Sequence, residues 1–109
     1  MSVTATRDLR EKHFGTWEGL TDEEILRRFP QARNRPWGDG ETTAALSERV
    51  LGALRRIAET HPDGHVLVVA HGGPVRAALL HCNAPLEGSI GNCHVVRIEV
   101  EEGSLRAVD

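Results

Sequence analysis

The chain has 109 residues, of which 39% are hydrophobic and 27% are charged, and its formal net charge is −3 at pH 7. This length and this composition are typical of one small globular domain with its own core. The chain contains no apolar run long enough to cross a bilayer and no block of Lys or Arg residues, which argues against a membrane protein and a nucleic-acid-binding protein.

The first predicted elements are a strand or extended segment at residues 3–9 and a short helix that ends near residue 29. Thr21 and Glu24 have the spacing of a capping box, in which each side chain satisfies a backbone N–H of the other residue. Pro30 then stops the helix.

Two loops are predicted around this helix, at residues 11–19 and 31–41, because glycines and a proline interrupt them and no apolar periodicity is present. The side chains of interest in these loops are Glu11, His13, Trp17 and Trp37. For the two tryptophans two roles stay open, namely lining a pocket or covering the core. An exposed glutamate is common, so Glu11 alone carries no functional prediction.

Residues 43–60 form the clearest predicted helix, because apolar residues recur at helical spacing throughout this segment. Charged residues fall between them and are predicted on the opposite, solvent face. They are Glu48, Arg49, Arg55 and Glu59.

An apolar run at residues 66–70 predicts a buried strand of a parallel sheet that ends at His71. Gly72 and Gly73 then form a turn, and Pro74 is suited to the first position of a helix that continues through residues 75–80. The start of such a helix offers free backbone N–H groups and partial positive charge beside His71, which favours phosphate binding. The alternative is that His71 only packs in the fold.

Residues 95–100 and 105–108 predict two strands that form an antiparallel hairpin across a short turn. The order of elements predicts an α/β sandwich with a mixed sheet. The sheet has few strands, however, so one of its edges is expected to be uncovered.

Cys82 and Cys93 form no CxxC pair, and the N-terminal residues do not show the basic-then-apolar pattern of a signal peptide, so we expect a reducing cytoplasm. A histidine adjoins each cysteine. Because Cys93 and His94 point to opposite faces of a strand, the pattern argues against a zinc site.

Two segments with specific motifs lie about 60 residues apart. Glu11 lies in LREKHFGTWEGLT and His71 lies in VVAHGGPVR, with GET at residues 40–42 before the long helix and Asn92 before the last strands. In this order they resemble the histidine phosphatase superfamily, the phosphoglycerate mutase-like proteins, over nearly the whole chain. FGTWEG is more similar to the phosphatase branches than to the glycolytic mutases.

The resemblance implies a partial phosphoglycerate mutase-like α/β/α sandwich with a mixed, mostly parallel sheet and a C-terminal hairpin. It implies hydrolysis of a small phosphorylated substrate through a phosphohistidine, without a cofactor or metal. By motif match Glu11 is the proton donor to the leaving oxygen and later the base for water. His71, with the N–H of Gly72, would hold the phosphoryl oxygens.

The sequence departs from the family pattern because it contains no Arg-His-Gly motif, in which the family's nucleophilic histidine lies. We therefore expect residues 1–109 to be a single, N-terminally truncated domain that is inactive alone. His13, two residues from Glu11, is a possible substitute nucleophile.

Three hypotheses follow, in this order. The chain is part of an enzyme that a complementary N-terminal segment completes, or a non-catalytic fragment that forms a homodimer, or a module that binds phosphate ligands. An uncovered sheet edge favours the first two, because it promotes association.

Overall fold

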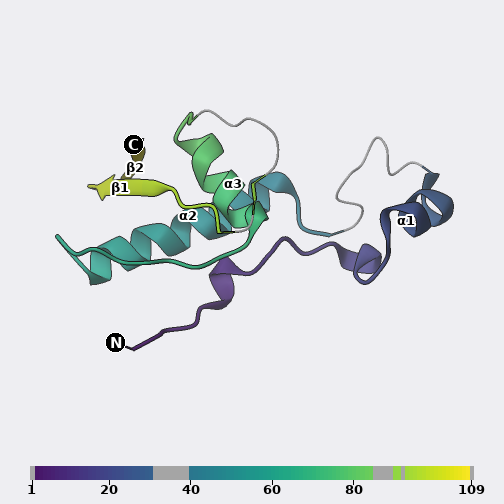
Figure 1. The fold of residues 1–109 in the computed structure, drawn as a ribbon, viewed down its shortest axis with the longest axis horizontal. Coiled ribbons are helices and arrows are strands. Elements are labelled where there is room, and N and C mark those ends of the chain that lie inside the picture. The colour runs from purple at the N-terminus through teal and green to yellow at the C-terminus, as the bar shows by residue number, and fades with distance from the viewer. Residues whose placement is uncertain (1, 31–39, 85–89, 92, 109) are drawn as a thin grey trace.

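The structure is a computed structural model that describes residues 2–30, 40–84, 90–91 and 93–108. Trp37 and Asn92 lie outside the described residues. The described residues include two 3₁₀ turns, three helices and one hairpin, arranged over 50 × 29 × 24 Å (Figure 1). In chain order these are η1 (Arg7–Leu9), η2 (Gly15–Trp17), α1 (Asp22–Arg28), α2 (Thr43–Thr60), α3 (Gly72–His81), β1 (Arg97–Glu101) and β2 (Ser104–Val108).

Helix α1 confirms the predicted capping box. The Thr21 hydroxyl accepts a hydrogen bond from the Glu24 N–H at 3.1 Å, and the Thr21 N–H donates to the Glu24 carboxylate at 3.4 Å. These bonds satisfy backbone donors that a helix start leaves free. Figure 1 shows α1 at one end of the long axis, and the hairpin at the other.

Helix α2 has the predicted bounds and forms the centre of the core. Its buried face packs against α3 and η1. The buried core residues are Leu9, Leu46, Val50, Ala53, Ala77 and Ala78, with Leu54, Ile57, Ala70 and Ile98 packed around them. This arrangement follows from the apolar spacing of α2, which places one continuous stripe toward its neighbours.

Helix α3 begins earlier than the sequence predicts. Gly72 and Gly73 are its first two residues rather than a turn, and Pro74 is its third residue rather than its first. The missing N–H of Pro74 still costs nothing there, because the first four N–H groups of a helix have no partner within it.

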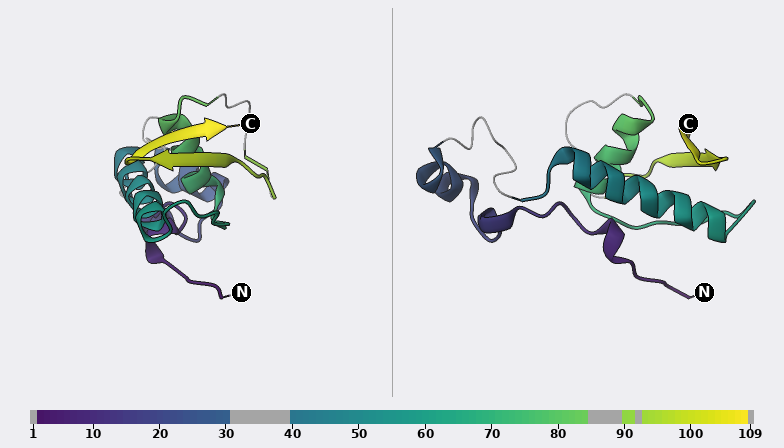
Figure 2. Two further views of the ribbon diagram at one scale, coloured as in Figure 1. Left: turned by 90° about the vertical axis from the view of Figure 1, so that its left-hand side faces the viewer. Right: turned by 180° about the vertical axis from the view of Figure 1, so that it is seen from behind.

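The predicted strand at residues 66–70 is wrong as a sheet element. The segment is extended, but no described residue pairs with it, and the side chains of Leu67 and Val69 are 82% and 84% exposed. A strand is stabilised by ladder hydrogen bonds to a neighbour, and the described chain supplies none. Figures 1 and 2 show the segment running back along α2 to the start of α3. Residues 3–9, predicted as a strand or extended segment, form no strand. Thr6 is extended, and η1 follows it at Arg7–Leu9.

The described residues contain one sheet, the antiparallel pair of β1 and β2, so the mostly parallel sheet is not confirmed. Glu102 and Gly103 connect the strands with positive φ angles of 51° and 80°. Two such residues make the turn whose twist matches a hairpin. The helices and this sheet are consistent with an α/β protein. No helix among the described residues is both long and apolar enough to span a membrane.

Candidate functional site

The structure brings Glu11 to the start of α3, 62 residues further along the chain. The Gly73 N–H donates a hydrogen bond to the Glu11 carboxylate at 3.4 Å, and the Lys12 N–H donates to the same carboxylate at 2.8 Å. A carboxylate is favoured at a helix start, where free N–H groups carry partial positive charge. The contact is close enough that a Cβ on Gly73 would overlap the Glu11 carboxylate.

Glu11 and His71 line one cleft of about 300 Å³, here called the His71 cleft. His71 is the extended residue that precedes α3, and its side chain makes no capping hydrogen bond. The cleft is lined by Glu11, Ala70, His71, Gly72, Val75, Ile90, Gly91, Cys93 and His94. Glu11, two histidines and the start of a helix therefore line one small space, and these residue types are suited to binding an anion and moving a proton.

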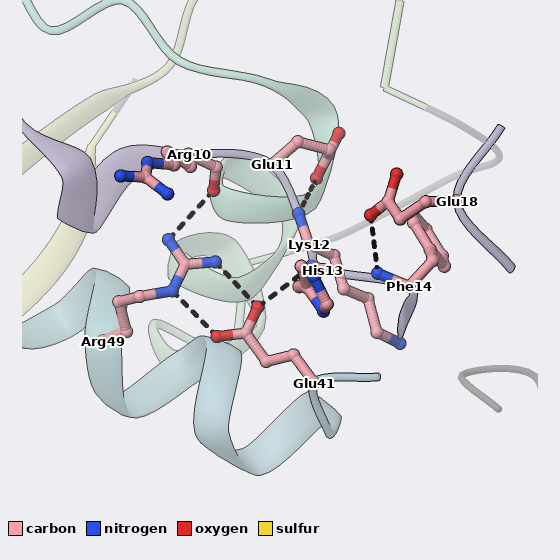
Figure 3. A pocket seen from close by; sticks show the side chains of 8 residues that line it. All are labelled: Arg10, Glu11, Lys12, His13, Phe14, Glu18, Glu41 and Arg49. Atoms are coloured by element: carbon pink, nitrogen blue, oxygen red, sulfur yellow. Dashed lines mark hydrogen bonds and ion pairs between the residues drawn. The ribbon is translucent and has the colours of Figure 1, made fainter. Parts of the chain in front are cut away.

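Glu11 also borders a second cavity of about 390 Å³, here called the Arg49 cavity, which Figure 3 shows. It is lined by Arg10, Glu11, Lys12, His13, Phe14, Glu18, Glu41 and Arg49. The guanidinium of Arg49 forms a bidentate pair with Glu41, with Nε and Nη2 each 2.8 Å from a different carboxylate oxygen. In Figure 3 the Glu11 side chain points away from this pair.

The Arg49–Glu41 pair is partly buried, with side-chain exposures of 21% and 15%. The hydrogen bonds from Arg49 hold the pKa of the Glu41 carboxyl below its usual range, although partial burial opposes the shift. The same hydrogen bonds raise the pKa of Arg49. Both side chains therefore stay charged at neutral pH.

Two other predicted site residues, His13 and Trp17, do not line the His71 cleft. His13 lines the Arg49 cavity, and its Nδ1 accepts a hydrogen bond from the Gly15 N–H at 3.1 Å. Trp17 is buried and packs against Phe29, with ring centroids 5.9 Å apart, and it lines neither cavity. Trp37 lies outside the described residues.

No motif in the sequence points to the contacts of Arg49 and Glu41, and the helical pattern predicts Arg49 on the solvent face of α2. That placement is wrong, because Arg49 bonds to backbone oxygens of the N-terminal segment. The prediction that Cys93 and His94 lie on a strand and point to opposite faces is wrong. Cys93 lies in a turn with a φ angle of 61°, β1 begins only at Arg97, and both residues line the His71 cleft. In the described part of the chain no three metal-ligating side chains gather into a group.

Comparison with known proteins identifies the family. The chain matches the histidine phosphatase superfamily (branch 1) over residues 1–109. Phosphoglycerate mutase-like protein 4 from Arabidopsis thaliana is 36% identical over 86 residues, which are 71% of this chain and 37% of that protein. The uncharacterized phosphatase PhoE from Bacillus subtilis is 33% identical over 79 residues, 72% of this chain and 39% of that protein.

A third relative, the metal-independent phosphoserine phosphatase from Arabidopsis thaliana, is 35% identical over 87 residues, 72% of this chain and 37% of that protein. The chain thus matches these relatives over 37–39% of their length. No solved structure matches it significantly. The match over the whole chain shows that this protein belongs to the histidine phosphatase superfamily, branch 1.

Proposed function

We propose that this chain carries the proton-transfer and phosphate-binding groups of a phosphomonoester hydrolase. The observation that supports this best is the cleft that Glu11 and His71 share at the start of α3. A phosphoryl group in this cleft would lie beside His71 and the N–H group of Gly72. These donors would stabilise the negative charge on its oxygens.

In the proposed reaction Glu11 donates a proton to the leaving oxygen and then takes a proton from the attacking water. The nucleophile is a histidine supplied from outside these 109 residues, because the sequence contains no Arg-His-Gly motif. His13 is not proposed for this role, because it lies in the Arg49 cavity while His71 lies in the other cleft. Phosphoryl transfer requires the nucleophile in line with the leaving group.

The substrate class is a small phosphorylated molecule in the cytoplasm. Two of the relatives carry phosphatase in their names, which supports hydrolysis over mutase activity. A complementary N-terminal segment is the partner that this proposal requires, since it would supply both the nucleophile and further positive charge.

A second candidate is a non-catalytic fragment that associates with itself. The exposed apolar side chains at residues 66–69 favour it, because an extended segment with free N–H and C=O groups is a template for pairing with another chain. A module that only binds phosphate ligands is the third candidate, which the same cleft supports.

Thermal unfolding of the purified chain with and without inorganic phosphate tests the proposed binding site. Phosphate is expected to raise the midpoint for the wild type, because a ligand that binds only the folded state stabilises it. The His71→Ala variant should lose this shift. His81→Ala should keep it, since His81 is exposed and lies at the opposite end of α3.

Hydrolysis of an aryl phosphate by the same variants tests the chemistry. No turnover above buffer is expected for the isolated chain, because its nucleophile is missing. Turnover that His13→Ala abolishes would refute the proposed mechanism and identify His13 as the nucleophile. Equal phosphate shifts in the wild type and in His71→Ala would refute the binding site.

A further inference from the structure

We propose that Arg49 and Glu41 form a clamp that positions the Glu11 carboxylate against Gly73. Glu11 lies on a segment without regular structure, between η1 and η2. Its side chain must nevertheless reach a defined place at the start of α3, because misplacing a catalytic group by about 1 Å costs about 100-fold in rate. Something outside the segment must therefore fix the backbone on both sides of Glu11.

Arg49 fixes the side that precedes Glu11. Its Nη1 donates to the carbonyl oxygen of Asp8 at 2.7 Å and to that of Arg10 at 2.9 Å. Both carbonyl groups lie within three residues of Glu11, and Arg49 reaches them from a helix whose inner face is packed in the core. The backbone that precedes Glu11 is thus hydrogen-bonded to helix α2.

Glu41 fixes the side that follows Glu11. Its N–H donates to the carbonyl oxygen of His13 at 2.7 Å, and its carboxylate accepts from the His13 N–H at 3.3 Å. The same carboxylate accepts hydrogen bonds from Nε and Nη2 of Arg49. The contacts on the two sides of Glu11 therefore form one connected network (Figure 3). Hydrogen bonds in such a network strengthen one another, so removing one member also weakens the bonds that remain.

The clamp requires the shape of arginine and not only its charge. Arg49 uses three nitrogen atoms in four hydrogen bonds that lie in different directions. Lysine has the same charge but a single nitrogen, and it cannot reproduce a planar fork. Arg56 offers a comparison, since its guanidinium also connects α2 to Asp8, by an ion pair with the Asp8 carboxylate at 2.6 Å. This pair is exposed, with side-chain exposures of 60% for Arg56 and 46% for Asp8.

The Gly73 amide provides a direct measure of where the Glu11 carboxylate lies. Its N–H is bonded to Glu11, so its NMR chemical shift should follow the ionisation of that carboxyl as the pH is lowered, and Glu11→Gln should remove this titration. We expect Arg49→Lys to abolish the titration of the Gly73 amide. Arg56→Lys should leave it unchanged.

The amides of β2 report whether a variant is folded, because among the described residues β2 pairs with β1 and none of its residues lines the Arg49 cavity. If Arg49→Lys is unfolded, Glu41→Gln tests the clamp in its place, and it should also abolish the titration of the Gly73 amide. An unchanged Gly73 titration in a folded Arg49→Lys or Glu41→Gln variant would overturn the clamp.

This inference rests on the proposed role of Glu11 but does not share its test. The amide titration requires neither phosphate nor turnover. A chain that binds no phosphate and still loses the Gly73 titration in Arg49→Lys would refute the proposed function and keep the clamp.

Discussion

Gly40 lies where the backbone before α2 approaches the Glu11 segment. A Cβ at this position would overlap the carbonyl oxygen of His13 and would lie 2.6 Å from the Phe14 carbonyl carbon. Both contacts are with backbone atoms, which cannot move aside as a flexible side chain would. We therefore expect Gly40→Ala to lower the free energy of unfolding in urea by about 1–3 kcal/mol.

Gly52 supplies the matched control for this substitution. It lies inside α2, and its nearest neighbour beyond the helix backbone is the mobile end of Arg56, at 3.3 Å. Gly52→Ala should raise the free energy of unfolding by roughly 0.5–1 kcal/mol, because alanine is favoured over glycine in helices. Equal losses in the two variants would contradict the close approach at Gly40.

At the level of single residues, the sequence predicts those residues of the candidate site that belong to a motif. Glu11 and His71 were selected from two motifs, and the structure brings both to the same cleft. Arg49 was assigned to solvent because a charged residue between apolar ones on a helix is usually exposed. Arg49 donates to the backbone oxygens of Asp8 and Arg10, which lie 41 and 39 positions earlier in the chain. Every residue type carries the same backbone oxygen. No sequence pattern encodes such a contact.

At the level of elements, the hydrogen bonds that connect α2 to the N-terminal segment through Arg49 and Glu41 depend on the charge of Glu41. Because Arg49 lowers the pKa of Glu41 in the folded state, the unfolded state binds more protons at acidic pH. The contribution of this pair is therefore complete above the unfolded pKa of about 4.3 and is lost as the pH falls through the lower folded value.

Urea unfolding between about pH 7 and pH 3 measures this effect. Glu41→Gln should cost about 1–3 kcal/mol at neutral pH, which is the range for hydrogen bonds to charged groups, and the difference from wild type should shrink at acidic pH. Glu99→Gln is the control, since the pKa of Glu99 is lowered by Arg106 but the pair is exposed and should contribute little. A constant difference across the pH range would contradict the prediction.

Helices and strands differ in how far the sequence predicts them. Helices α1 and α2 make their hydrogen bonds within themselves, and their caps come from adjacent residues such as Thr21 and Thr42. The hairpin is also local, because its turn sets its register. Residues 66–70 have the composition of a strand, yet a strand becomes part of a sheet only when a neighbour is present. The sequence of the segment alone cannot supply that neighbour.

At the level of the whole molecule, the exposed apolar segment at residues 66–69 is the feature from which we predict how the chain associates. Leu67 and Val69 alternate with Val66 and Val68, and all four are at least 37% exposed. Burying contiguous apolar surface is favourable, and free backbone groups beside it promote strand pairing. The chain spans 37–39% of the length of the three relatives compared above, so the part of such a relative that has no counterpart here could supply a neighbour for this segment.

We therefore expect the isolated chain to associate, with an average mass in sedimentation that rises above 12.0 kDa as its concentration increases. Leu67→Lys should shift the chain toward the monomer, because a charge at the pairing segment opposes burial. Val95→Lys is the matched control, since both side chains are 82% exposed but Val95 lies outside this segment. Hydrogen exchange at residues 66–69 should slow with concentration in the wild type and in Val95→Lys. A 12.0 kDa monomer at every concentration, with rapid exchange at these amides, would show that the segment does not pair with a second copy, which would leave the complementary N-terminal segment as its partner.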